Sequence, residues 1–124
     1  MAIDYDQEYN TRAYAPDHVE VLGRIAKGAA DYRARAMAEK RAELDVRYGA
    51  TPRQIVDIFY SSAGPNAPVA VFIHGGFWRA LQPSAFSEAA AGLNARGVTV
   101  ALPGYDLAPQ VGIGDIVEQM RAAL

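Results

Sequence analysis

The sequence predicts an α/β fold, and three observations carry that prediction. The segment Val69–Ile73 is a short apolar run rich in β-branched and aromatic residues, which is typical of a strand covered on both faces. A second run of this kind, Val98–Leu102, follows a segment whose apolar residues recur at helical spacing. Strand, helix and strand in this order indicate a right-handed βαβ unit with parallel strands.

Composition excludes several classes of partner. A chain of 124 residues with 51% apolar and 21% charged residues suits one globular domain with a buried core. The formal net charge of -2 lacks the basic surplus of a nucleic-acid binder, and no apolar run approaches the roughly 20 residues that span a bilayer. The acidic N-terminus does not resemble a signal peptide, and the absence of cysteine agrees with a reducing compartment. We therefore expect a cytoplasmic protein that binds neither nucleic acid nor membrane.

Residues 1–16 are polar and aromatic without a period, which predicts an extended arm lying on the body of the protein. Its tyrosines, Tyr5, Tyr9 and Tyr14, are interpreted as packing residues in preference to residues that gate a substrate.

A long helix is expected next, over residues 17–41. Asp17 can cap it, and Glu20 completes a pattern like that of a capping box. A break near Gly28 is the alternative to one continuous helix. The expected buried face comprises Val19, Leu22, Ile25, Ala26, Ala29 and Ala30.

The period then changes to that of strands. Alternating apolar residues over 44–48 and 56–60 predict two half-exposed strands, and the turn formers at 49–52 make an antiparallel pair the economical interpretation. The residues expected to share the apolar face are Leu44, Val46 and Tyr48 in the first strand, and Val56, Ile58 and Tyr60 in the second.

Two further helices are predicted in the second half of the chain. One begins at Pro83-Ser84 and ends at Gly97, which can adopt a left-handed conformation. Its expected apolar positions are Phe86, Ala89, Ala90 and Leu93. The other is an amphipathic helix over residues 113–124, with Asp115 near its positive end.

The most informative segment follows the first apolar strand and reads His74-Gly75-Gly76-Phe77-Trp78. Paired glycines let a backbone turn sharply and approach another group closely. We favour the interpretation that this group is the charged oxygen of an acyl-transfer transition state. A plain glycine turn into a helix, with or without a bound phosphate, is the alternative.

Three segments together carry a resemblance to a known family: residues 9–18, residues 74–78, and Tyr105-Asp-Leu-Ala-Pro109 running into residues 116–119. The chain resembles the N-terminal part of an α/β-hydrolase of the arylformamidase (kynurenine formamidase) and hormone-sensitive-lipase-like esterase group. The resemblance implies a partial α/β-hydrolase fold: an N-terminal arm and helix over 1–41, then over 42–124 a β-hairpin and a βαβα segment, with the C-terminal half missing.

The resemblance also implies roles for particular residues. In that family the loop after this strand forms part of the oxyanion hole, so the backbone N–H groups of Gly75, Gly76 and Phe77 are the candidate donors. His74 is expected to brace the loop and not to act as the catalytic base. The residues expected to line the substrate pocket are Phe77, Trp78 and Tyr105, with core packing an equal alternative for the first two and a structural turn favoured over direct catalysis for Tyr105 and Asp106.

The family's Gly-x-Ser-x-Gly nucleophile elbow, and the acid and base after it, have no counterpart in residues 1–124. Ser62 is rejected as a nucleophile because Tyr60 stands where the first glycine belongs. We expect no cofactor, and no metal site, since neither His18 nor His74 has a second ligand at a suitable spacing.

Two functions remain open. The first is a portion of a serine hydrolase that acts on an aryl formamide or a carboxylic ester, inactive by itself. The second is a non-catalytic, truncated remnant that binds a partner. In the family the strand at Val69 lies between the strand at Val98 and the nucleophile strand, so we expect a bare edge here. Such an edge favours aggregation, a homo-oligomer or pairing with a complementary C-terminal half.

Overall fold

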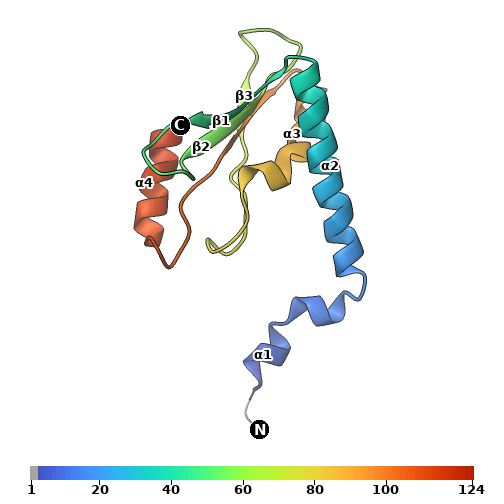
Figure 1. The fold of residues 1–124 in the computed structure, drawn as a ribbon, viewed down its shortest axis with the longest axis vertical. Helices are drawn as coiled ribbons and strands as arrows, with labels where there is room; N and C mark the ends of the chain where they lie inside the picture. Colours follow the sequence, from blue (N-terminus) through green and yellow to red (C-terminus); the bar gives the residue numbers. More distant parts are fainter. Residues whose placement is uncertain (1–2) are drawn as a thin grey trace.

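A computed structural model describes residues 3–124 and shows helices packed around a mixed β-sheet (Figure 1). In chain order the elements are α1 (Tyr5–Glu8), the 3-10 helix η1 (Thr11–Tyr14), α2 (His18–Ala38), β1 (Ala42–Arg47), β2 (Ile55–Phe59), β3 (Val69–Val71), the 3-10 helix η2 (Pro83–Ala89), α3 (Ala90–Asn94), β4 (Thr99–Pro103) and α4 (Ile113–Ala123). No helix among these described residues is long and apolar enough to cross a bilayer.

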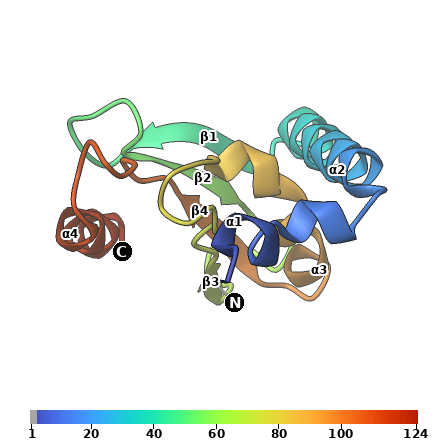
Figure 2. The same ribbon diagram turned by 90° about the horizontal axis from the view of Figure 1, so that it is seen from below.

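The sheet has the strand order β1-β2-β4-β3. β1 pairs with β2 and β2 with β4 in antiparallel fashion, whereas β3 and β4 are parallel. The predicted hairpin and the predicted parallel strands with a helical connection are therefore confirmed. Figure 2 shows α2 and α4 on opposite sides of the strands.

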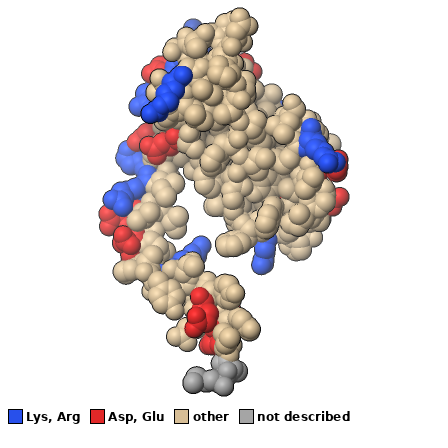
Figure 3. Space-filling view, turned by 180° about the vertical axis from the view of Figure 1, so that it is seen from behind, with Lys and Arg blue, Asp and Glu red and all other residues tan. Residues whose placement is uncertain are grey.

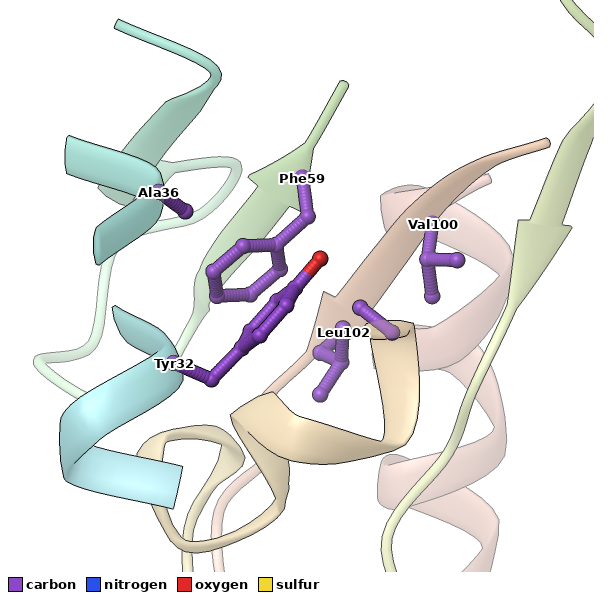
Figure 4. Packing of buried hydrophobic residues seen from close by; sticks show 6 residues of the cluster. Tyr32, Ala36, Phe59, Val100 and Leu102 are labelled. Atoms are coloured by element: carbon purple, nitrogen blue, oxygen red, sulfur yellow. The ribbon is translucent and has the colours of Figure 1, made fainter. Parts of the chain in front are cut away.

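The main core lies between the sheet and the C-terminal half of α2. Tyr32 packs its ring against that of Phe59, with ring centroids 5.5 Å apart (Figure 4). The buried residues of this cluster are Tyr32, Ala36, Phe59, Ala90, Val100 and Leu102.

The predicted inner face of β2 is only partly correct. Val56 is buried as expected, but Ile58 is half-buried and Tyr60 is exposed, whereas Asp57 and Phe59 on the other face are buried. Helix α2 covers the face that bears Asp57 and Phe59. Its residues Tyr32 and Ala36 pack with Phe59, and its Arg33 forms an ion pair with the Asp57 carboxylate. A buried charge is tolerated when it is paired in this way.

Helix α2 is continuous, so the alternative of a break at Gly28 is wrong. Its predicted apolar face is only partly correct: Ala29 is buried, as are Tyr32 and Ala36, but Val19 keeps 71% of its surface exposed. The N-terminal half of α2 projects beyond the sheet (Figure 1), so Val19, Leu22 and Ile25 stay exposed within residues 3–124. Asp17 precedes the helix without making a capping hydrogen bond from its side chain, contrary to expectation.

The predicted extended arm is also different in the structure. Residues 3–16 contain α1 and η1, and they continue away from α2 instead of lying on the body (Figure 3). Tyr5, Tyr9 and Tyr14 are all exposed, so the preferred interpretation of these side chains as packing residues is wrong for the described part of the chain.

Strand β3 lies at the edge of the sheet, where only β4 pairs with it. The exposed fractions of Val69 and Val71 are 63% and 42%. The prediction that this strand is covered on both faces is therefore wrong within residues 3–124, while the predicted bare edge is confirmed.

The helical part of the connection between β3 and β4 consists of η2 and then α3, and Gly97 follows it with the expected left-handed φ of 81°. Of the expected apolar positions only Ala90 is buried, and its buried neighbours are polar, Ser87 and Asn94. Asn94 is satisfied there because its amide donates to the carbonyls of Phe59 and Val98. The predicted C-terminal helix is confirmed as α4, which buries Ile116 and Met120.

Candidate active site

The glycine loop, residues 72–82, connects the carboxyl end of β3 to η2. Tyr105 lies two residues beyond the carboxyl end of the neighbouring strand β4. Because β3 and β4 are parallel, their carboxyl ends lie side by side, and both segments begin there. In open α/β sheets, ligands bind at the carboxyl ends of the strands. The structure thus brings His74 and Tyr105 together.

His74 is held between two aromatic rings. Only 3% of its surface is exposed, and its imidazole stacks on Tyr105 with centroids 4.4 Å apart and on Phe86 with centroids 5.8 Å apart. Its Nδ1 lies 2.7 Å from the carbonyl oxygen of Gly75 and must carry the proton there, since a carbonyl only accepts. Burial lowers the pKa of His74, against a smaller raising effect of this hydrogen bond. A neutral, enclosed imidazole suits a bracing role and not that of a general base.

The loop has an unusual backbone. Gly76 has a φ of 124°, and a Cβ atom at this position would collide with the carbonyl oxygen of Ala80. Three residues with side chains also have positive φ: 53° at Phe77, 56° at Trp78 and 74° at Leu81. Each such conformation costs on the order of 1 kcal/mol and persists only when the surroundings hold it.

Contacts from outside the loop hold it through its carbonyl oxygens. The Tyr105 hydroxyl donates to the carbonyl of His74 over 2.7 Å, and the Ala108 N–H donates to the carbonyl of Trp78 over 2.8 Å. The guanidinium of Arg53 donates to the carbonyl of Leu81. Inside the loop, the Arg79 N–H closes a turn on the Gly76 carbonyl over 3.0 Å.

The N–H groups of the loop are used differently. Within residues 3–124, the backbone N–H groups of Gly75, Gly76, Phe77 and Trp78 donate to no protein acceptor. Beyond Phe72, whose N–H donates to the Ala101 carbonyl, the loop is fixed through its carbonyl oxygens, and the consecutive N–H groups of residues 75–78 are left for another group. Such an arrangement can receive a negatively charged oxygen.

The aromatic residues of the site differ in exposure. Phe77 is 88% and Trp78 51% exposed, so core packing is wrong for both within the described residues. Tyr105 is only 2% exposed and packs on Ile116 and Met120 of α4. It therefore lies beneath the loop and does not open on a pocket there, and burial raises its pKa.

The contacts of Asp106 agree with the structural role that was favoured over direct catalysis. Its carboxylate accepts hydrogen bonds from Thr51 over 2.9 Å and from the Gln119 amide over 3.0 Å, and its N–H donates to the Gln119 side-chain oxygen over 2.8 Å. These bonds tie α4 to the segment after β4.

Within residues 3–124 there is no cluster of three or more His, Asp or Glu side chains placed to hold a metal.

Sequence reasoning missed Arg53, which reaches the loop from the turn between β1 and β2. Its Nε donates to the Tyr105 carbonyl over 2.8 Å. No local pattern marks this contact, because its partners are distant in sequence.

Ser62 lies between β2 and β3, near the amino end of β3, whereas the glycine loop follows the carboxyl end of β3. This position is consistent with its rejection as a nucleophile.

Comparison with known proteins gives a consistent group of relatives. Kynurenine formamidase of Drosophila melanogaster is 41% identical over 75 residues, which are 60% of this chain and 25% of that protein. Kynurenine formamidase of Danio rerio is 30% identical over 91 residues, which are 73% of this chain and 31% of that protein. The chain thus spans well under half the length of these relatives. No family model matches it.

Solved structures agree. The crystal structure of a candidate thioesterase from a Silicibacter species aligns with a TM-score of 0.85 and 34% identity, over 98% of this chain and 45% of that one. Esterase B of Lactobacillus rhamnosis aligns with a TM-score of 0.62 and 22% identity, over 87% of this chain and 38% of that one, and it supports the fold alone. In sequence this chain is similar to part of kynurenine formamidases, and in fold it is similar to part of a candidate thioesterase and of an esterase.

Proposed function

We propose that residues 1–124 supply the oxyanion-hole loop of a serine hydrolase that acts on an aryl formamide or a carboxylic ester. The observation that carries the proposal is the set of unpaired N–H groups at Gly75, Gly76 and Phe77, in a loop that external contacts hold by its carbonyls. Donors fixed in this way before the substrate arrives are worth about 3 to 4 kcal/mol each in comparable sites.

In the proposed reaction a serine oxygen attacks the carbonyl carbon of the substrate and transfers its proton to a base. The carbon–oxygen double bond of the carbonyl becomes a single bond, and its electron pair moves to the oxygen, which the loop N–H groups then stabilise. When the tetrahedral intermediate collapses, the amine or alcohol leaves with the proton that the base returns, and water then hydrolyses the acyl-serine to release the acid and the free serine. The serine, the acid and the base come from outside residues 1–124.

The exposed side chains of Phe77 and Trp78 are free to contribute apolar surface to the substrate site. Tyr105 and His74 support the loop from below, so we assign Tyr105 to bracing and not to the pocket wall. The names of the sequence relatives favour a formamide over an ester as substrate.

The test compares two glycines whose substitution the structure tolerates. A Cβ atom at Gly75 or at Gly23 meets nothing within 4 Å. In the gene-encoded polypeptide, the valine side chain of Gly75→Val is expected to keep the substrate carbonyl away from the loop N–H groups. It should therefore lower kcat for N-formylkynurenine or p-nitrophenyl acetate on the order of 100-fold. The matched control, Gly23→Val on α2, should keep kcat. An unchanged kcat in Gly75→Val would overturn the oxyanion assignment.

A second measurement tests where the nucleophile lies. Residues 1–124 alone are expected to show no turnover above background. Turnover that a serine-directed phosphonate abolishes would contradict the proposal that the nucleophile lies outside them.

Binding without catalysis is a second candidate, and the exposed edge of β3 favours it. A backbone edge with apolar side chains can pair with a strand of a second copy or of a complementary chain. A gene product that folds and associates through β3 but never hydrolyses either substrate would favour this function over catalysis.

A further inference from the structure

Arg53 connects two segments that lie far from it in sequence. It belongs to the turn between β1 and β2, and its Nε donates to the Tyr105 carbonyl over 2.8 Å. A terminal nitrogen of the same guanidinium donates to the carbonyl of Leu81, near the end of the glycine loop. One side chain thus joins the first hairpin, the loop and the segment after β4.

We infer that Arg53 is a positioning residue that sets the backbone conformation of the glycine loop, and thereby the direction of its free N–H groups. The inference rests on the proposed function for its catalytic consequence, but its structural consequence can be measured independently.

The strain in the loop shows why such a clamp is needed. Leu81 has a φ of 74°, a conformation that a leucine does not hold without external contacts. The hydrogen bond from Arg53 is made at the carbonyl of this residue. At the other end of the loop the contact comes from Tyr105, whose own carbonyl is bound by Arg53. Two of the external contacts to the loop therefore depend on one guanidinium.

The base from which Arg53 reaches is rigid. The Gly104 N–H donates to the Ile55 carbonyl over 2.7 Å, and the Tyr48 hydroxyl donates to the Gly104 carbonyl. A Cβ atom at Gly104 would lie 2.7 Å from the Arg53 carbonyl oxygen, so the backbones of the turn and of β4 approach as closely as glycine allows. A movement of the turn would thus be opposed by the sheet.

The contact also requires an arginine. Its planar guanidinium offers donors in a fixed fork, so Nε and a terminal nitrogen can serve two different carbonyls at once. A lysine keeps the positive charge but carries a single nitrogen on a flexible stem. Arg53→Lys consequently separates the geometry of the clamp from its charge.

The chain contains one tryptophan, Trp78, and it lies in the loop. We expect Arg53→Lys to raise the acrylamide quenching constant of Trp78 and to lower its fluorescence anisotropy, with the circular dichroism spectrum unchanged. Arg47→Lys is the matched control, because Arg47 is exposed and makes no side-chain hydrogen bond or ion pair with residues 3–124. Equal Trp78 quenching in the two variants would overturn the inference.

A kinetic measurement on the gene-encoded polypeptide gives the second readout. Displacing oxyanion donors by about 1 Å can reduce a rate on the order of 100-fold, so Arg53→Lys should lower kcat strongly while KM changes little. A loosened loop with unchanged kcat would overturn the positioning role. If the wild-type gene-encoded polypeptide shows no turnover, the proposed function fails. Trp78 quenching alone then decides whether Arg53 holds the loop.

Discussion

Tyr105 lies face to face with His74, and its hydroxyl donates to the backbone carbonyl of that same residue. The ring centroids are 4.4 Å apart with planes inclined by 12°, and the hydrogen bond measures 2.7 Å. One side chain therefore supplies both the stacking surface and the donor for the start of the glycine loop. The carboxyl ends of β3 and β4 are joined at this point by side chains as well as by the strand ladder.

Replacing Tyr105 by phenylalanine should destabilise the fold while keeping the stacked ring. The loss of the hydroxyl leaves the buried His74 carbonyl without this donor, which costs about 1 to 3 kcal/mol in the free energy of unfolding. Urea unfolding measures this change. Tyr14→Phe is the control, because Tyr14 is exposed, and a loss of equal size there would contradict the explanation.

Stability should depend on pH through His74. Burial lowers its pKa in the folded state below the ordinary value of 6.5, so below pH 6.5 the unfolded chain binds a proton that the folded chain does not. The free energy of unfolding should therefore be highest above pH 6.5 and fall as the pH drops from there towards the folded pKa. Urea unfolding across this range should show the fall, and His74→Gln should reduce its slope. Identical slopes in the two proteins would contradict the prediction.

The two loop glycines should respond differently to alanine. Gly76→Ala places a methyl group against the Ala80 carbonyl at a φ of 124°, so we expect a loss of about 1 to 3 kcal/mol and a shifted Trp78 emission. Gly75→Ala meets no neighbour and should change the free energy of unfolding by less than about 0.5 kcal/mol. Thermal unfolding followed by tryptophan fluorescence distinguishes them, and equal effects would be inconsistent with the loop geometry.

The edge of β3 should limit the solubility of residues 1–124. A lysine on an exposed edge strand opposes pairing with another chain, so Val71→Lys should raise the concentration at which light scattering begins. Val19→Lys adds the same charge to an exposed valine on α2, far along the chain from this edge. If both variants raised the threshold equally, net charge and not the edge would be responsible.

Local periodicity predicted the strands, the hairpin and α4, because these elements depend on residues that are close in sequence. It could not predict that the face of β2 bearing Asp57 and Phe59 is buried. Asp57 points inward only because Arg33, on a distant helix, neutralises it, and the N–H of Asp45 adds a hydrogen bond over 2.9 Å. The contact is made between elements, so a window along one strand cannot reveal it.

The candidate site shows the same division. The glycine pair and its position after a strand were visible in the sequence, since close backbone approach restricts which residues can stand there. The supports from Arg53 and Ala108 were not visible, because each meets the loop through a carbonyl oxygen that every residue possesses. Such contacts leave no trace in residue type on the accepting side.

The use of carbonyls to hold the loop has a consequence for its electric field. Each peptide group carries a dipole that points from oxygen to N–H, so an anchor on the oxygen side also fixes the direction of the dipole. At His74 and Trp78 the oxygen end is engaged by protein donors, while the N–H groups from Gly75 to Trp78 meet no protein acceptor within residues 3–124. An anion that reaches them meets dipoles already set by folding, so little reorganisation energy is needed when its charge develops.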